Sequence, residues 1–259
     1  MQLPLSAAVA EHLELLPEVG STNVELAARA SASRLPHFTV VATTNQTAGR
    51  GRLDRRWIAP PDTTIAASVL LAHPPATPLD RLGWLPLLAG LAMTNAVSSL
   101  VTDHAVTLKW PNDVQIDGLK VAGLLAEFVP ASHAVIIGAG LNLTMSEAEL
   151  PTETATSLTL NGVPPVEIVD RALSTFLGQL GRLYLEFKAA DFDAEVSGLR
   201  AAVAASCSTL GKRVRVELPG GNDLYGTAES LDAMGRLVVR TRTEQVTVAA
   251  GDVTHVRYE

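Results

Sequence analysis

Cysteine is nearly absent from this sequence. Its 259 residues include a single cysteine, Cys207, so no internal disulfide framework can hold the chain together. A chain of this kind fits a reducing compartment, and we expect the protein to be cytoplasmic. Because no cluster of metal-ligating residues accompanies Cys207 in the sequence, we expect its side chain to pack in the core.

The sequence also lacks an excess of positive charge and any apolar run long enough to span a membrane. Aspartate and glutamate number 27 against 20 lysines and arginines, which gives a formal net charge of −7. General affinity for nucleic acid needs a basic surface that neutralises phosphates, so we expect no DNA partner. The apolar run at residues 82–97 is interrupted by Pro86 and is too short to span a membrane. Residues 1–16 include Glu11 and Glu14 and no basic leader, so we expect no signal peptide.

The composition that remains is that of a compact globular protein. Hydrophobic residues make up 47% of the chain and charged residues 18%, which suits one large domain or a large and a small one. After Cys207 the pattern changes to short segments that alternate apolar and polar residues, at 213–218, 223–231, 236–240 and 245–248. Short strands at this spacing indicate a small β-barrel. We therefore expect a large domain over residues 1–207 and a small β domain over residues 208–259.

The large domain mixes helical and strand patterns. Thr22 and Glu25 have capping-box spacing and predict a helix that runs to about Ala32. The dipeptide Asp117-Gly118 predicts a tight β-hairpin. Further helices are predicted at residues 5–16, 78–100, 165–187 and 191–206, and further strands at residues 38–44, 65–71, 106–110 and 134–143.

An arginine-rich segment joins two of the predicted strands. Four arginines lie within the seven residues from Arg50 to Arg56, beside two glycines. Glycines let the backbone approach a ligand closely, and guanidinium groups bind carboxylate or phosphate oxygens through paired hydrogen bonds. The alternative is a solvated surface turn. Its position between strands 38–44 and 65–71 favours an anion-binding loop.

Lysine is rare, and one lysine follows the predicted hairpin. The chain has four lysines, of which Lys109 and Lys120 lie in one short segment. Simple strand alternation places Lys120 on one face with Ala122 and Leu124, and Gly123 on the other. A lysine in a largely apolar strand is costly to bury without an anionic partner. Lys120 is therefore either an anion-binding residue or an exposed lysine beside a turn.

Four segments together resemble the biotin protein ligases. They are STN at residues 21–23, NQTAGRGRLDRRW at 45–57, KWPNDV and KVAGLLAEF between 109 and 128, and IIGAGLNL at 136–143. The resemblance covers nearly the whole chain, without the N-terminal DNA-binding domain of bifunctional members. It implies an α+β catalytic domain related to class II aminoacyl-tRNA synthetases, with a mixed, largely antiparallel sheet and flanking helices, and a small SH3-like C-terminal β-barrel.

The resemblance also implies an activity and a set of roles. Biotin and ATP would form biotinyl-5′-adenylate, and a lysine of the biotin carboxyl carrier domain of an acyl-CoA carboxylase would then receive the biotinyl group. The implied catalytic residues are Lys120, Arg50 and Arg52. The implied biotin-binding residues are Ser21, Thr22, Asn23, Gln46, Gly49, Arg50, Gly51, Arg52, Trp57, Lys120 and Gly123. The implied ATP-binding residues are Arg52, Arg55, Lys109, Asn112, Asp113, Lys120 and Asn142.

Some of these implications are more specific than others. Ser21 and Gln46 are expected at the ureido group of biotin, and Thr22 along its valeryl chain. Trp57 and Trp110 are expected to line the pocket or its floor. Mg²⁺ is expected on the triphosphate, with Asn112 or Asp113 as candidate ligands. The enzyme is expected as a monomer or weak homodimer.

Two other functions are compatible with parts of the pattern. A lipoate or octanoate ligase shares the fold and the adenylate chemistry, but GRGRxxRxW, KWPND and the polar Gln46 favour a ureido ligand. A biotin-sensing DNA-binding regulator is disfavoured by the acidic charge. For residues 21–23, capping of a helix is an alternative to ligand binding, and both can hold at once because a helix N-terminus presents free amide donors.

Overall fold

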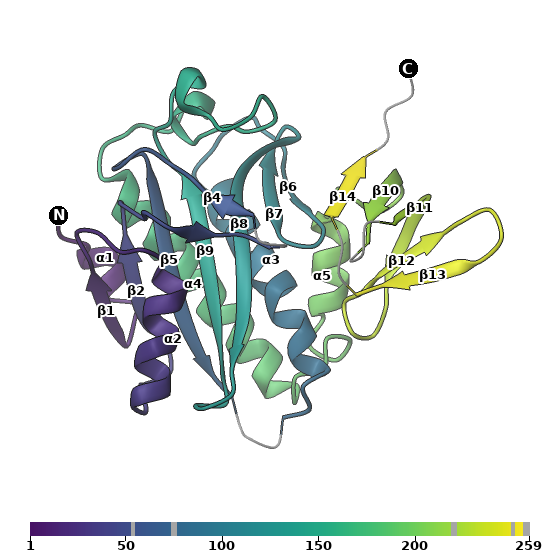
Figure 1. The fold of residues 1–259 in the computed structure, drawn as a ribbon, viewed down its shortest axis with the longest axis horizontal. Coiled ribbons are helices and arrows are strands. Elements are labelled where there is room, and N and C mark those ends of the chain that lie inside the picture. The colour runs from purple at the N-terminus through teal and green to yellow at the C-terminus, as the bar shows by residue number, and fades with distance from the viewer. Residues whose placement is uncertain (53–54, 74–76, 219–221, 250–251, 256–259) are drawn as a thin grey trace.

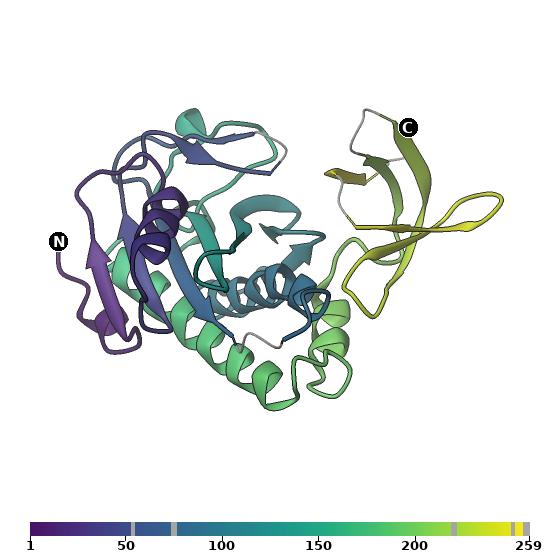
Figure 2. The ribbon, with the colours of Figure 1, turned by 60° about the horizontal axis from the view of Figure 1, so that its bottom comes forward.

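The computed structural model describes residues 1–52, 55–73, 77–218, 222–249 and 252–255. It consists of a large α+β part, in which helices pack on a mixed sheet, and a separate C-terminal sheet, seen side by side in Figures 1 and 2. Within the described residues no helix combines the length and apolarity needed to cross a membrane. Leu53 and Asp54 of the arginine segment, and residues 219–221 between two of the predicted C-terminal strands, lie outside the described part of the chain.

The large domain is built on a seven-stranded sheet with the order β1-β2-β5-β9-β8-β7-β6. Only the β1-β2 pair is parallel, and the other five pairs are antiparallel. The strands are β1 (His12–Leu15), β2 (Thr39–Thr43), β5 (Thr64–Ala72), β6 (Val106–Lys109), β7 (Asp113–Ile116), β8 (Leu119–Val129) and β9 (Ala134–Asn142). The predicted mixed, largely antiparallel sheet is confirmed.

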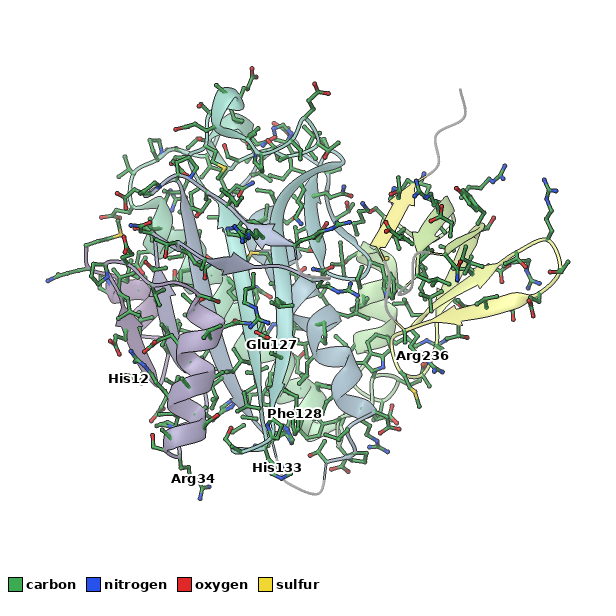
Figure 3. All side chains as sticks on the ribbon, in the orientation of Figure 1. His12, Arg34, Glu127, Phe128, His133 and Arg236 are labelled. Carbon is green, nitrogen blue, oxygen red and sulfur yellow. The ribbon has the colours of Figure 1, made fainter. Side chains whose placement is uncertain are left out.

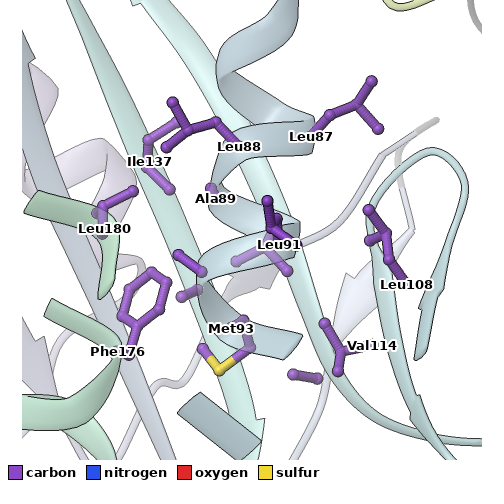
Figure 4. Close-up of a cluster of buried hydrophobic side chains, with 14 of the residues drawn as sticks. Leu87, Leu88, Ala89, Leu91, Met93, Leu108, Val114, Ile137, Phe176 and Leu180 are labelled. Carbon is purple, nitrogen blue, oxygen red and sulfur yellow. The ribbon is translucent and has the colours of Figure 1, made fainter. Parts of the chain in front are cut away.

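Helices cover the two faces of this sheet unequally. Helices α3 (Leu85–Ser98) and α4 (Ile168–Ala189) pack on one face and form the main core with alternate residues of the strands. Figure 4 shows part of this core around α3. On the opposite face α2 (Thr22–Ala32) covers a small cluster that includes Leu70 and Ile136. The rest of that face, beyond the N-terminus of α2, is available for a pocket.

The hairpin signal at Asp117-Gly118 is confirmed by the backbone. Both residues have positive φ, 50° at Asp117 and 85° at Gly118, as a two-residue turn of the primed type requires. The turn joins β7 to β8, and the carboxylate of Asp117 also accepts a hydrogen bond from the Ala105 amide (2.9 Å). The start of β8, and with it Lys120, is thereby fixed.

The C-terminal domain is a five-stranded antiparallel sheet of SH3-like type with the order β13-β12-β11-β10-β14. Its strands are β10 (Arg213–Glu217), β11 (Asp223–Leu231), β12 (Leu237–Arg240), β13 (Gln245–Val248) and β14 (Asp252–His255). Two buried tryptophans of the large domain anchor its β11-β12 turn. The indole of Trp84 donates to the carbonyl of Ala233 (2.8 Å), and that of Trp110 to the carbonyl of Gly235 (3.1 Å).

Some predicted helices are wrong in extent or type. Residues 5–16 form only the short helix α1 (Pro4–Ala7), and β1 follows it. The helix expected at residues 78–100 is the 3-10 turn η1 (Arg81–Trp84) followed by α3. The last predicted helix is reduced to α5 (Leu199–Ser206). The buried strands, the α2 bounds and the single long helix α4 agree with the sequence patterns.

Candidate active site

The pocket has a floor of small residues on the open face of the sheet. Strand register places Ala66, Gly140 and Gly123 in one row across β5, β9 and β8. The next row, toward α2, contains Ser68 and Gly138. In the row beyond, Leu70 and Ile136 lie under α2. The same face therefore passes from an apolar helix contact to a polar row and then to an open glycine floor.

The N-terminus of α2 forms one wall of this pocket. Ser21 precedes the helix in an extended conformation, and its side chain makes no capping bond. The loop before α2 pairs with the segment after β2 through the Val19↔Gln46 bridge. The Gln46 side chain consequently reaches the helix, where its Oε1 atom accepts a hydrogen bond from the Thr22 amide (3.0 Å). Gln46 supplies the cap that the sequence assigned to a capping box.

The arginine segment folds over the pocket as a short hairpin. Strand β3 (Gly49–Arg50) pairs with β4 (Arg56–Trp57), and Gly49 is opposite Trp57. A β-carbon at Gly49 would lie 2.5 Å from both the Gln46 amide nitrogen and the Trp57 carbonyl. Only glycine fits this contact, which brings the arginine backbone against the Gln46 wall.

The indole of Trp57 lies on the glycine floor. A β-carbon at Gly140 would be 2.6 Å from the ring, and one at Gly123 would be 3.3 Å from it. The ring nitrogen is buried and makes no hydrogen bond with the described residues. Lys120 approaches the same ring, with Nζ 5.9 Å from its centroid. Trp57 thus covers the part of the pocket that the glycines leave open.

The cations of the site are held by acidic or amide oxygens of the protein. Nζ of Lys120 is 2.7 Å from Oδ1 of Asp113. An Arg50 guanidinium nitrogen lies 3.3 Å from a carboxylate oxygen of Glu127, and Arg52 donates to Oδ1 of Asn112 (3.2 Å). Each of these three cations therefore already has an oxygen partner within the protein.

A bulge decides which face Lys120 occupies. Between β7 and β8 the register moves from Val114↔Ala122 to Gln115↔Lys120, so one extra residue is present on β8. Val121 and Ala122 are both fully buried in the main core. The predicted alternation is therefore wrong: Lys120 lies on the same side as Gly123, beside the pocket, because the bulge reverses its direction.

Most of the residues singled out in the sequence line this pocket of about 150 Å³. They are Ser21, Thr22, Asn23, Gln46, Arg50, Gly51, Arg52, Arg55, Trp57, Asn112, Asp113, Lys120 and Gly123. Gly49 lies just behind Gln46. Residues from five separate segments of the chain are thus brought together.

Three residues are placed elsewhere. Asn142 is buried and donates to the carbonyl of Thr156 (2.9 Å), which ties the polar loop after β9 to the sheet. Lys109 lies near His255 of the C-terminal sheet. The pKa of His255 is lowered, first by burial of the imidazole and then by the positive charge of Lys109. Trp110 is buried against the same sheet. The structure does not bring these three into the pocket.

Two polar residues of the site were missed by sequence analysis. Ser68 is fully buried in β5, where its hydroxyl contacts Asn23 Oδ1 (2.6 Å) and Thr22 Oγ1 (2.8 Å). Glu127 of β8 accepts a hydrogen bond from the Asn23 side-chain amide (2.6 Å). The available signal was one polar residue in each of two otherwise apolar strands, IAASVLLA and LLAEFV, since buried polar groups need partners.

Asn112 and Asp113 have the chemistry to share a magnesium ion with phosphates. Mg²⁺ prefers hard oxygen ligands and is commonly held by one or two protein oxygens beside substrate phosphates. Both residues line the pocket, where the Oδ1 atom of Asn112 accepts from Arg52 and that of Asp113 pairs with Lys120. In the described residues there is no group of three or more His, Cys, Asp or Glu side chains that could hold a metal.

Comparison with known proteins identifies the architecture. A model of the biotin/lipoate A/B protein ligase family matches residues 16–142, and one of the biotin protein ligase C-terminal domain matches residues 209–256. These matches place the chain in the class of biotin and lipoate ligases.

Individual relatives narrow the class. The chain is 38% identical to the biotin–[acetyl-CoA-carboxylase] ligase of Mycobacterium tuberculosis, over 95% of this chain and 89% of that protein. It is 28% identical to the corresponding ligase of Paracoccus denitrificans, over 92% of this chain and 98% of that one. The biotin protein ligase of Aquifex aeolicus, solved with biotin and ATP, superposes with a TM-score of 0.72 at 26% identity, covering 96% of this chain and 100% of that chain. The chain belongs to the biotin protein ligase family.

Proposed function

We propose that this protein is an ATP-dependent ligase that activates biotin and transfers it to a lysine of a carrier domain of an acyl-CoA carboxylase. In the first step a biotin carboxylate oxygen attacks the α-phosphorus of ATP, so that biotinyl-5′-adenylate forms and pyrophosphate leaves. In the second step the acceptor amine attacks the biotinyl carbonyl, AMP leaves, and the amine loses a proton. The enzyme relatives named above act on acetyl-CoA carboxylase.

The first step brings together two groups that repel each other, a carboxylate and a triphosphate. Lys120, Arg50 and Arg52 converge on the pocket and would screen this repulsion. Each must exchange a protein oxygen for a ligand oxygen, because Asp113, Glu127 and Asn112 now hold them. Mg²⁺, when bound, would supply further charge neutralisation of the triphosphate.

The choice of biotin rests on the polar end of the pocket. Ser21, Thr22 and Gln46 surround a small region at the N-terminus of α2, where a ureido group can both donate and accept hydrogen bonds. The dithiolane ring of lipoate offers no such groups and would leave these buried polar atoms unpaired, which costs binding energy. This polar end is the observation that carries the proposal.

Other features of the enzyme extend this proposal. Arg55 would contact ATP from the pocket rim, and ATP contacts by Lys109 and Asn142 stay predictions. The division into a catalytic domain at residues 1–207 and a C-terminal domain at 208–259 is supported by the change from the mixed sheet to the second, antiparallel sheet. The chain has a single cysteine, Cys207, which supports a location in the cytoplasm. A monomeric or weakly dimeric state and the absence of a DNA partner stay predictions.

Exchange of radioactive pyrophosphate into ATP tests the proposal. We expect exchange that depends on biotin and is not supported by lipoate or octanoate at the same concentration. Exchange with lipoate alone would assign the chain to the other branch of the class.

A further inference from the structure

The connection between β6 and β7 carries two side chains into the active-site pocket. Residues 110–112 join the last residue of β6 to Asp113, the first residue of β7, and these two end residues pair with one another. Asn112 and Asp113 line the pocket, where their side chains contact Arg52 and Lys120. The groups that hold this short connection therefore determine where the two side chains lie.

Trp110, the first residue of the connection, is held by the C-terminal domain at two points. Its main-chain amide donates to the Oγ1 atom of Thr209 (3.0 Å), and its indole nitrogen donates to the carbonyl of Gly235 (3.1 Å). Trp110 is exposed by 2% and Thr209 by 0%. Because both hydrogen bonds are buried, removal of either acceptor leaves a buried donor without a partner, which is costly.

The β11-β12 turn, which supplies the Gly235 carbonyl, is itself firmly held. The Asp232 carboxylate accepts hydrogen bonds from the amides of Met234 (2.9 Å) and Arg236 (3.0 Å). A β-carbon at Gly235 would lie 2.9 Å from the side chain of Leu87, so the turn packs closely on α3. Figure 3 shows Arg236, directly after the turn, on the side of the C-terminal sheet nearest the large domain. The turn therefore gives Trp110 a fixed anchor.

Asn112, the last residue of the connection, is bound to β8. Its carbonyl accepts from the Leu124 amide (2.9 Å), and its side-chain nitrogen donates to the Leu124 carbonyl (2.7 Å). The side-chain oxygen of Asn112 accepts from Arg52. A cavity of about 350 Å³ adjoins the connection and is lined by Trp110, Pro111, Asn112 and part of the β11-β12 turn. The described residues leave this cavity unfilled, so the connection depends on the hydrogen bonds at its two ends.

We propose that Trp110 is a positioning residue through which the C-terminal domain places Asn112 and Asp113 for ATP. This inference rests on the proposed function, in which these two side chains serve the triphosphate. Trp110 does not line the active-site pocket and acts through the residues that follow it. One end of the connection is fixed in the C-terminal domain and the other on β8, so release of the first end lets Asn112 and Asp113 shift relative to Arg52 and Lys120.

Trp84 supplies a matched control for this role. Its indole donates to the carbonyl of Ala233 (2.8 Å) in the same turn, and its side chain is buried like that of Trp110, with 1% exposed. Trp84 lies on η1, however, and not on the β6-β7 connection. Trp84→Phe and Trp110→Phe therefore each remove one indole bond between the domains, but only the second variant changes the connection itself.

The first measurement is the KM for each substrate in pyrophosphate exchange. We expect Trp110→Phe to raise the KM for ATP about five- to tenfold, the effect of losing one buried hydrogen bond, and to change the KM for biotin by less than about twofold. Thr209→Val keeps the side-chain shape but removes the acceptor, and it should do the same, whereas Thr209→Ser should stay within about twofold of the unmodified enzyme. Trp84→Phe should leave both KM values within about twofold, even where it lowers the melting temperature as much as Trp110→Phe.

Hydrogen–deuterium exchange at the Leu124 amide, followed by NMR, tests the connection without any activity. This amide donates to Asn112, so its deuterium uptake should be faster in Trp110→Phe and Thr209→Val than in the unmodified enzyme or in Trp84→Phe. The inference is overturned if folded Thr209→Val keeps either its KM for ATP or its Leu124 uptake rate, or if Trp84→Phe raises the KM for ATP as much as Trp110→Phe. Absence of biotin-dependent pyrophosphate exchange by the unmodified enzyme would instead contradict the proposed function, and the Leu124 measurement would then decide the inference separately.

Discussion

Removal of the Lys120 ammonium should abolish most adenylate formation while leaving the fold intact. In the structure its ion pair with Asp113 is partly exposed, at 37% for the lysine side chain and 23% for the aspartate. Pairs of this kind contribute less than about 1 kcal/mol to stability. In the reaction the same ammonium must leave Asp113 and face a carboxylate and an α-phosphate, where loss of one such partner costs about 2 to 4 kcal/mol in the transition state. Lys120→Ala should therefore lower kcat/KM for exchange roughly 30- to 1000-fold.

The assay is biotin-dependent pyrophosphate exchange, with thermal unfolding measured in parallel. Lys188→Ala is the matched control, because it removes a lysine in the last turn of α4, remote from the pocket. It should keep full activity. The reasoning is refuted if Lys120→Ala exchanges within about threefold of the unmodified enzyme at an unchanged melting temperature, since Lys120 would then be only the exposed lysine beside a turn.

Three further predictions concern the hairpin, the glycine floor and pH. Arg52→Gly should release biotinyl-adenylate from the pocket, seen as more biotin on serum albumin than with the unmodified enzyme at matched adenylate output; no increase would mean that Arg52 does not retain the intermediate. In Gly140→Ala the new β-carbon would lie 2.6 Å from the Trp57 indole ring, so the variant should displace the ring, destabilise the fold by about 1 to 3 kcal/mol and raise the KM for biotin. The control variant Gly178→Ala has open space around the new methyl group and should stabilise helix α4 by about 0.5 to 1 kcal/mol. Equal melting temperatures for the two variants would contradict this prediction. Burial lowers the pKa of His37 below its ordinary 6.5, so as pH falls the unfolded chain binds a proton before the folded chain does. The free energy of unfolding should therefore fall as pH drops below about 6.5. Urea titrations of His37→Gln should show a weaker fall, and an identical pH dependence would mean that His37 is not its cause.

Local signals predicted the parts of the site that are local in sequence. The Asp117-Gly118 turn, the α2 bounds and the glycine-arginine segment depend on backbone preferences and hydrophobic periods that neighbouring residues set. These signals were enough to place Lys120 near a turn. They were also enough to identify the family, because four motifs agree in order.

Features that depend on distant partners could not be read from the sequence. Leu13 and Leu15 have helical spacing with their neighbours, yet they form a strand because they pair in parallel with Val40 and Ala42 of β2. The bulge that turns Lys120 toward the pocket exists because Val121 and Ala122 both pack in the core. In both cases tertiary contacts override the local period.

The partners of polar groups were equally hidden. Thr22 and Glu25 have the spacing of a capping box, but the Thr22 hydroxyl bonds to Ser68 on a strand 46 residues away, and Glu25 pairs with Arg29. A local motif cannot show that a side chain has a better partner across the fold. The hydrogen bonds that Ser68 makes with Thr22 and Asn23 behind the pocket form only because α2 packs on the sheet.

The central claim is that this chain joins biotin to a carrier lysine, and intact-mass measurement of the carrier tests it most directly. A purified biotin carboxyl carrier domain is incubated with the enzyme, ATP, Mg²⁺ and biotin, and in parallel with lipoate in place of biotin, with a carrier whose acceptor lysine is replaced by arginine as the control. The account predicts the gain of one biotinyl group per carrier, at the acceptor lysine, dependent on ATP and absent from the arginine carrier. A carrier that stays unmodified with biotin, or that gains a lipoyl group instead, would contradict it.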